Sequence, residues 1–217
     1  RVTPEALIGE LDPPFDDLTD VIFVGEAEET WPRFLEEWGR GEHGTRYEQA
    51  EKTDMSKMPV PRFDLLKTRH YLFASLQFSR GCPFQCEFCD IIVTFGRRPR
   101  LKTADHVVRE LEAIRAEGMD IAFIVDDNLI GNKREIKPLL ARVADWQQAN
   151  GYPLLFFTEA SVDLSEDPEL MQLMVDANIT SVFVGIESPN EASLIETKKL
   201  QNVREGTTLV DRVRTIQ

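Results

Sequence analysis

The sequence predicts an α/β protein built around a parallel β-sheet, and two observations support this fold class. From Tyr71 onward, short apolar runs alternate with amphipathic stretches of ten or more residues, which is the pattern of repeated strand-helix units. The apolar runs are also continuous, as expected for strands that are covered on both faces. Hydrophobic residues make up 42% of the chain and charged residues 29%, a composition typical of a globular protein.

The first 70 residues predict the end of one module followed by a connector. The run "DVIFVGE" (20–26) is expected to form a buried strand, and "EETWPRFLEEWGRG" (28–41) places large apolar residues at helical spacing before a glycine. The segment that follows is polar, contains two prolines and shows no sustained period. We therefore interpret residues 1–41 as the C-terminal part of a module and residues 42–70 as a linker.

Residues 71–217 predict four strand-helix units. The helix over 103–118 is the clearest, because Thr103 is a suitable N-terminal cap and Gly118 a suitable C-terminal stop. The other expected elements are strands at 71–79, 121–127, 154–161 and 181–187, and helices at 133–151, 167–178 and from about 203 to the end.

Polar or thiol side chains follow each predicted strand. In parallel α/β folds the functional residues gather at the carboxyl ends of the strands. We therefore expect an active-site face formed by residues 79–89, 126–128, 158–161 and 187–188.

The charge and the overall composition exclude several classes of protein. A formal net charge of -13 opposes binding to nucleic acid, which requires clustered Lys and Arg, and the basic stretch at 96–102 is too short to change this. No apolar run reaches the roughly 20 residues that span a bilayer. The chain begins with Arg1 and shows no signal peptide, so we expect part of a longer protein that is located in the cytoplasm.

All three cysteines of the chain, Cys82, Cys86 and Cys89, fall within eight positions in a C-x3-C-x2-C arrangement. The same spacing could place three small core residues on one helix face. Gly81 and Pro83 flank the first cysteine, however, and they interrupt a helix. The cysteines are therefore expected on a loop where they converge on a bound group.

The chemistry of that group has two main alternatives. A structural zinc site needs four ligands, so His70 or His106 would have to complete it, and we expect His106 to lie on the surface of its helix. A 4Fe-4S cluster held by three thiolates uses every cysteine and leaves one iron open to a small molecule. The residues favour the iron-sulfur cluster.

The cysteine motif, with Phe88 directly before its last cysteine, resembles the radical S-adenosylmethionine (SAM) superfamily. The stretches "GCPFQCEFCDIIVTFGRRPRLKT", "FIVDDNLIGNK", "TEASVDLSEDPELMQLM", "SVFVGIESPNEASL" and "KKLQN" resemble its cobalamin-binding branch, which includes hopanoid C-2 methylases. The resemblance extends from about residue 20 to the end. It implies a partial radical SAM (β/α)6 barrel with about four units, preceded by the C-terminal remnant of a Rossmann-like cobalamin-binding domain.

Two departures from the family pattern matter. The D-x-H-x-x-G motif that supplies a cobalt-ligating histidine in many cobalamin domains is absent from the sequence. The predicted barrel also has four strand-helix units where the superfamily normally has six. Cobalamin binding would therefore depend mostly on residues outside this chain.

The resemblance implies roles for individual residues. The cysteines would be the metal ligands, Phe88 would lie against the adenine of SAM, and Asp126 and Asp127 would accept hydrogen bonds from its methionine amino group. Glu187 would contact the ribose or the methionyl part. Weaker candidates for cofactor contacts are Glu159 and Ser161, and Arg97, Arg98 and Arg100 could neutralise a carboxylate, although a solvated charge run is the simpler interpretation for the arginines.

The resemblance also implies an activity. The cofactors would be a 4Fe-4S cluster, S-adenosylmethionine and cobalamin, and the partners would be a small-molecule or lipid substrate and an external one-electron donor such as flavodoxin or ferredoxin. The expected reaction is methylation of an unactivated carbon through a 5'-deoxyadenosyl radical. Two alternatives are another radical SAM enzyme, such as a methylthiotransferase, and a non-catalytic iron-sulfur or zinc-binding module.

Overall fold

The computed structural model describes residues 19–217, which divide into two compact units. The first contains residues up to Asp54 together with Val93–Phe95, and the second contains Met55–Ile92 and Gly96–Gln217. Residues 1–18, which belong to the first predicted module, lie outside the described residues. Within residues 19–217, no helix combines the length and the apolar composition that crossing a membrane would require.

The first unit is a small β-α-β arrangement. Strand β1 (Ile22–Val24) pairs in parallel with β2 (Arg46–Glu48), and helix α2 (Thr30–Arg40) connects them. An aromatic cluster joins the elements, with the Phe23 ring 5.4 Å from those of Phe34 and Tyr47. The interpretation of residues 42–70 as a linker therefore needs correction at β2, because a three-residue strand is too short to show an apolar period but still pairs with β1.

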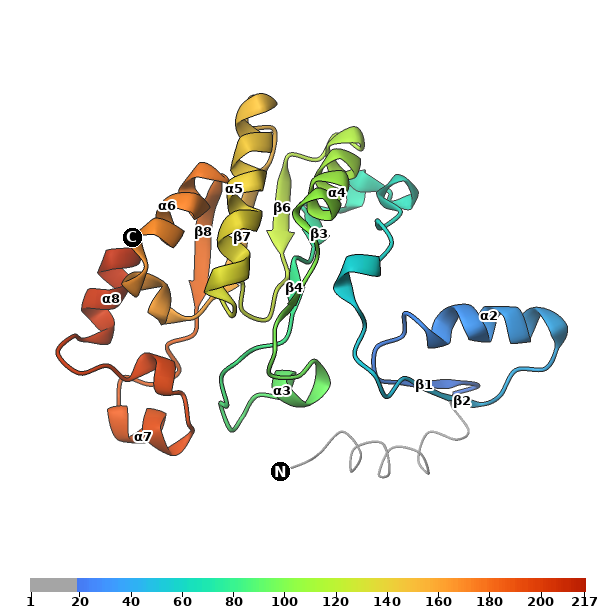
Figure 1. Cartoon of the computed structure of the whole chain (residues 1–217), viewed down its shortest axis with the longest axis horizontal. Helices are drawn as coiled ribbons and strands as arrows, with labels where there is room; N and C mark the ends of the chain where they lie inside the picture. Colours follow the sequence, from blue (N-terminus) through green and yellow to red (C-terminus); the bar gives the residue numbers. More distant parts are fainter. Residues whose placement is uncertain (1–18) are drawn as a thin grey trace. The chain divides into compact units, whose positions relative to one another are not determined.

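The second unit is built on a parallel sheet. Its strands are β3 (Ala74–Leu76), β6 (Ile121–Ile124), β7 (Leu155–Ala160) and β8 (Ile179–Val184), in the spatial order β3-β6-β7-β8. All three pairings are parallel, and β7 and β8 shift register at Phe156/Phe157. The predicted parallel α/β architecture is thus observed (Figure 1).

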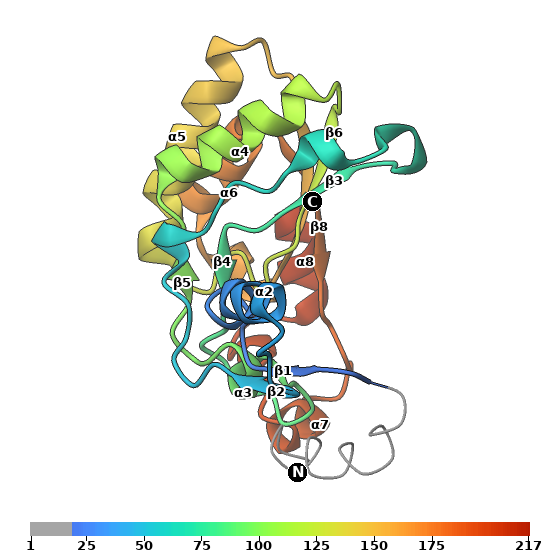
Figure 2. The ribbon, with the colours of Figure 1, turned by 90° about the vertical axis from the view of Figure 1, so that its right-hand side faces the viewer.

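Three helices cover one face of this sheet (Figure 2). They are α4 (Ala104–Ala116), α5 (Lys133–Ala149) and α6 (Pro168–Asp176). Each begins at a residue whose side chain accepts a hydrogen bond from a backbone N–H of the first turn, namely Thr103, Asn132 and Asp167, which satisfies donors that a helix start leaves unpaired. The core lies between these helices and the strand residues that point toward them.

The opposite face of the sheet is left largely uncovered by the described residues, and we call it the open face. It is formed by side chains that alternate with the core positions, because successive residues of a strand point to opposite faces. Phe156 is fully buried, for example, whereas Phe183 is 70% exposed. The paired positions Ser75, Phe123, Phe157 and Ser181 form one row of the open face, and Glu159 and Phe183 form part of the next.

The remaining elements connect this framework. The last predicted helix begins at Leu209 rather than near 203, because a 3-10 turn and a loop occupy the preceding residues. The other helices and strands are β4 (Ser79–Arg80), α3 (Ile91–Thr94), β5 (Arg100–Leu101), α7 (Glu191–Glu196) and α8 (Leu209–Ile216), and the 3-10 turns are η1 (Met55–Lys57), η2 (Phe63–Leu65), η3 (Thr68–His70), η4 (Val162–Glu166) and η5 (Leu200–Asn202).

Candidate functional site

The three cysteines lie on an irregular loop after β3 and β4, at the carboxyl end of the sheet. Residues 81–90 contain no helix, so the helix-face alternative is excluded. Gly81 begins the loop with a φ of 103°, a left-handed conformation that favours glycine. The loop returns as β5, which pairs antiparallel with β4, and the N–H of Cys82 donates to the carbonyl of Gly96 at 3.2 Å. The fold therefore closes this segment at its base.

The thiols are free and partly or fully buried. Cys86 is buried, and Cys82 and Cys89 are half-buried. Burial raises the pKa of the Cys82 thiol, and the neighbouring Cys89 and Cys86 raise it further, against hydrogen bonds from Phe84 and Asn128 that lower it. The Cys82 sulfur thus lies within electrostatic reach of the other two thiols. A thiolate here needs a nearby positive group, which bound iron would supply.

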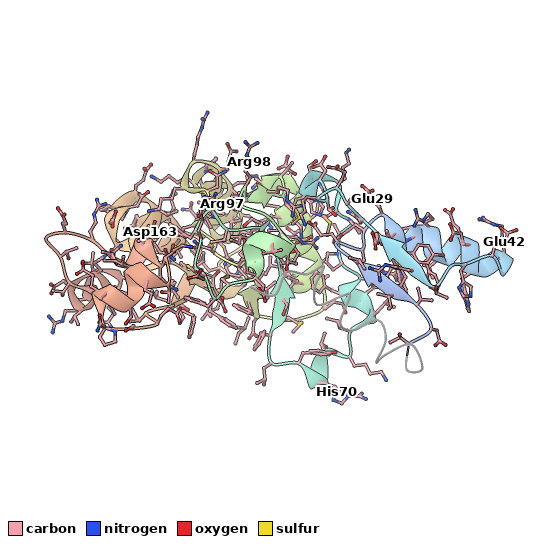
Figure 3. All side chains as sticks on the ribbon, turned by 90° about the horizontal axis from the view of Figure 1, so that it is seen from below. Glu29, Glu42, His70, Arg97, Arg98 and Asp163 are labelled. Atoms are coloured by element: carbon pink, nitrogen blue, oxygen red, sulfur yellow. The ribbon has the colours of Figure 1, made fainter. Side chains whose placement is uncertain are left out.

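The three thiols match the ligand count of a 4Fe-4S cluster with one open iron, whereas a structural zinc site needs a fourth ligand. The thiolates of a 4Fe-4S cluster bind separate irons, whereas zinc requires its ligands to converge on one centre. Among residues 19–217, no group of three or more His, Cys, Asp and Glu side chains is arranged around a single ion. His70 is exposed on η3, which precedes β3 (Figure 3). It therefore lies at the start of β3, whereas the cysteine loop follows the end of that strand.

His106, the second histidine considered for zinc, is buried rather than on the surface of its helix. It is 1% exposed and lies with Glu110 and Lys102, whose charged groups are 2.5 Å apart. The prediction of a surface position was wrong, because the side of α4 that carries His106 and Glu110 is covered by the segment after β5, which contains Lys102.

The two aspartates after β6 have different surroundings. Asp126 is 1% exposed, and its carboxylate accepts hydrogen bonds from the Phe78 N–H at 2.7 Å and the Ser79 hydroxyl at 2.5 Å. Burial raises the pKa of Asp126 to about 7, although these hydrogen bonds lower it. Both oxygens of Asp126 are engaged in the junction between β3 and β4, and its contact with a cofactor stays a prediction.

Asp127 is half-buried and accepts a hydrogen bond from the N–H of Gly81 at 2.9 Å. Burial raises its pKa, whereas the Gly81 N–H and the charges of Arg80 and Arg100 lower it. This carboxylate is therefore placed directly beside the start of the cysteine loop. Its role toward a cofactor stays a prediction.

Asn128 joins the cysteine loop to the end of β7. Its Nδ2 donates to Ser161 Oγ at 3.0 Å and lies 3.9 Å from Cys82 Sγ, and its Oδ1 accepts from the Ser161 N–H at 3.2 Å. Ser161 is thus engaged in positioning this corner. The structure brings Asn128, Ser161 and Cys82 together.

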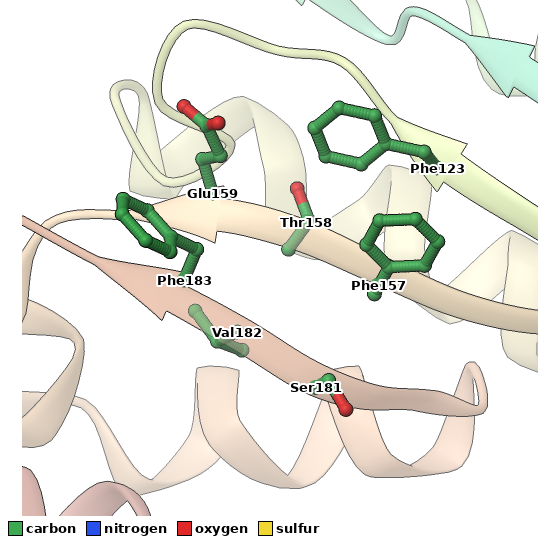
Figure 4. Close-up of a pocket in the computed structure, with 7 residues that line it drawn as sticks. All are labelled: Phe123, Phe157, Thr158, Glu159, Ser181, Val182 and Phe183. Carbon is green, nitrogen blue, oxygen red and sulfur yellow. The ribbon is translucent and has the colours of Figure 1, made fainter.

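Glu159 lines a cavity of about 400 Å³ on the open face (Figure 4). Phe123 and Phe157 stack in its wall with ring centroids 4.7 Å apart, and Phe183 lies on the other side. The remaining lining residues are Thr158, Ser181 and Val182. The cavity is therefore apolar with a single carboxylate among its lining residues.

Glu187 and Phe88 are brought together by a residue that the sequence analysis missed. Glu187 has a φ of 62°, and its Oε1 lies 2.7 Å from Nζ of the buried Lys199. The same Nζ is 5.7 Å from the centre of the Phe88 ring, which is 55% exposed. Lys199 belongs to the stretch "KKLQN", which the family resemblance includes without implying a role for any of its residues.

The three arginines that follow the cysteines differ in exposure. Arg97 and Arg98 are exposed (Figure 3), and Arg97 donates to the carbonyl of Pro83 at 3.3 Å. Arg100 is half-buried in β5. The exposure of Arg98 is consistent with a solvated charge, whereas Arg97 contacts the cysteine loop at Pro83.

A family model described as the radical SAM superfamily matches residues 76–217, which include the cysteine loop and the whole β3-β6-β7-β8 sheet except the first two residues of β3. The chain belongs to the radical SAM superfamily. Its parallel sheet is accordingly part of a radical SAM barrel.

Individual relatives fit this assignment. The chain is 50% identical over 186 residues to an uncharacterized methyltransferase of Synechocystis sp.. The matched region covers 85% of this chain and 35% of the relative. It is 38% identical over 167 residues to the hopanoid C-2 methylase of Rhodopseudomonas palustris, with 76% and 31% covered. The chain therefore spans about a third of the length of these relatives.

Among solved structures, the fold is similar to that of OxsB, a cobalamin-dependent SAM radical enzyme with aqua-cobalamin and SAM bound. The TM-score is 0.67 at 17% identity, and the match covers 97% of this chain and 36% of that chain. At this identity, the likeness supports the fold.

Proposed function

We propose that this radical SAM protein is a cobalamin-dependent methyltransferase that acts on an unactivated carbon of an apolar substrate. The observation that carries the proposal is the loop with three thiols at the carboxyl end of the parallel sheet, in a chain of this superfamily. The hopanoid C-2 methylase at 38% identity favours methyl transfer over the other reactions of the superfamily.

The three thiols would hold the cluster. Cys82, Cys86 and Cys89 provide three ligands, which leaves one iron of a 4Fe-4S cluster for SAM. When bound, such a cluster would supply the one electron, received from an external donor, for the reductive cleavage of SAM. The free thiols favour a reducing compartment, and we propose the cytoplasm.

Several residues around the cysteine loop would contact SAM. Phe88 offers an exposed ring on the cysteine loop, and Glu187 is held close to it by Lys199. Asp127 provides a partly exposed carboxylate beside Gly81. We propose that these three side chains contact SAM, whereas Asp126 positions the strands beneath it.

The cavity on the open face favours an apolar substrate. Its walls contain the stacked rings of Phe123 and Phe157 together with Phe183, and apolar surface of this kind contributes to binding by its removal from water. Glu159, the one carboxylate among the lining residues, would orient a polar group of the substrate. A lipid-like molecule fits this combination.

The first unit would be the closing part of a cobalamin-binding domain. Its parallel β1 and β2 joined by α2 are the end of a Rossmann-like pattern. Cobalamin, when bound, would supply the methyl group. In this chain, the β1-α2-β2 unit would supply the residues that contact cobalamin.

Anaerobic reconstitution with iron and sulfide tests the proposal. We expect about four irons per chain and an electron paramagnetic resonance (EPR) spectrum of the reduced protein that changes on addition of SAM. Cys86→Ala should lose most of this iron, whereas Gln172→Leu, an exposed position on α6 that bonds to Asp176, should retain it. One zinc per chain and no response to SAM would contradict the proposal.

A further inference from the structure

A segment more than a hundred residues away in the sequence lies against the cysteine loop. The N–H of Glu87 donates to the carbonyl of Thr197 at 2.9 Å, and the Glu87 carboxylate pairs with Lys198 at 3.6 Å. In the same segment, Nε2 of Gln201 lies 3.3 Å from Sγ of Cys86. The fold therefore presents a side-chain amide to the most buried of the three sulfurs.

The backbone on both sides of Gln201 is held in place. The carbonyl of Gln201 accepts a hydrogen bond from Nη1 of Arg212 at 3.0 Å. Arg212 is itself buried and pairs with Glu166 at 2.9 Å. On the other side, Nδ2 of Asn202 donates to the carbonyls of Gly185 and Ile186 at 2.9 and 3.0 Å. The position of the amide is thus fixed by contacts that do not involve its own side chain.

The amide of Gln201 is oriented so that its N–H group, and not its oxygen, faces Cys86. A metal-bound thiolate can only accept a hydrogen bond, so an N–H must face the sulfur. The Oε1 atom of Gln201 is buried and has no hydrogen-bond partner among residues 19–217. Leaving a buried acceptor unpaired is unfavourable, and a gain elsewhere should offset it. The contact that the amide makes in return is the one between its Nε2 and Cys86.

We propose that Gln201 is a positioning residue that raises the reduction potential of the cluster through its hydrogen bond to Cys86. This inference rests on the proposed function, because it assumes that Cys86 holds an iron. Reduction adds negative charge to the cluster, and hydrogen bonds to the sulfurs stabilise that charge. At 3.9 Å, the contact between Asn128 and Cys82 is longer and should have a smaller effect.

The variants Gln201→Leu and Gln201→Glu test this inference. Leucine removes the donor and the unpaired oxygen at similar size, so the fold should be retained. Glutamate keeps the shape but places an acceptor beside the sulfur. The measurements are iron per chain and an anaerobic redox titration of the reconstituted protein followed by EPR, with Gln172→Leu as the control.

We expect Gln201→Leu to retain its iron and to become about tenfold harder to reduce, which corresponds to about 59 mV for a one-electron couple. Gln201→Glu should shift the potential further in the same direction, and the control should leave it unchanged. An unaltered potential at normal iron content would overturn the inference. So would loss of the cluster from both variants, since that would show a purely structural role. An unchanged protein that takes up no cluster would instead refute the proposed function on which the inference rests.

Discussion

The two faces of the β3-β6-β7-β8 sheet both carry phenylalanine side chains but have opposite surroundings. On the face covered by α4, α5 and α6, side chains such as Phe156 and Ile124 are fully buried. On the open face, Phe183 is 70% exposed and Phe73 is 38% exposed. A cluster of large exposed apolar side chains usually indicates a binding surface. The comparison therefore separates residues that stabilise the fold from residues that are available for the proposed substrate.

The largest effect is expected where the two faces meet on adjacent positions of β7. Phe156→Ala removes a fully buried ring and should lower the free energy of unfolding by about 3 to 5 kcal/mol, because it leaves a cavity in the core. Phe157→Ala is the matched variant on the open face. It should cost roughly 1 kcal/mol, mostly through the lost stacking on Phe123.

Denaturant titration of both variants under anaerobic, reducing conditions provides the measurement. The important quantity is the difference between the two, since the residues are neighbours with the same side chain. Equal losses of stability would contradict the assignment of one face to the core and the other to the site.

A polar version of the same comparison exists at the end of β6, where Asp126 is buried and Asp127 is half-buried. The pKa of Asp126 is about 7 in the folded protein and about 3.9 in an unfolded chain. Between these values the folded state binds the proton more tightly. The contribution of this protonation to the free energy of unfolding is fully present below about pH 4 and is lost as the pH rises to about 7.

Asp126→Asn should remove this dependence on pH. The amide keeps an oxygen for the Phe78 N–H and a donor for the Ser79 hydroxyl, without a buried charge. As the pH rises from 4 to 8, the free energy of unfolding of the variant should increase by on the order of 3 kcal/mol relative to that of the unchanged protein. Asp127→Asn is the control and should change the pH profile less. A profile of Asp126→Asn that follows that of the unchanged protein would show that Asp126 is not the titrating group.

The sequence predicts those features of the fold that depend on local chemistry. The helix after Thr103 was predicted from its cap, and the structure confirms that the Thr103 side chain accepts from the His106 N–H. The parallel strands were predicted from continuous apolar runs. Such runs do not reveal which face a helix will cover, so Phe156 and Phe157 could not be distinguished before the pairing with β8 was known.

The candidate site was predictable where the residues are close together in the sequence. The cysteine loop stands out because its three thiols fall within eight positions. The contacts of Lys199 with Glu187 and of Gln201 with Cys86 depend on how distant segments fold together. No local sequence pattern predicts such contacts. For the same reason, the sequence could not show that the Asp126 carboxylate accepts hydrogen bonds from Phe78 and Ser79.

The smallest effect on stability is expected at Phe183, although it should have a clear effect on binding. Its ring is 70% exposed and lines the cavity of the open face. Phe183→Ser should change the free energy of unfolding by less than about 0.5 kcal/mol, as is usual for exposed positions. Binding of an apolar fluorescent dye to the open face should weaken severalfold, because apolar surface in the cavity is lost. Phe73→Ser, an exposed position on the same face that is not among the lining residues of the cavity, should affect dye binding less. A loss of more than about 2 kcal/mol in the Phe183 variant would mean that this ring is buried in the folded protein, and the open face would then belong to the core rather than to a substrate site.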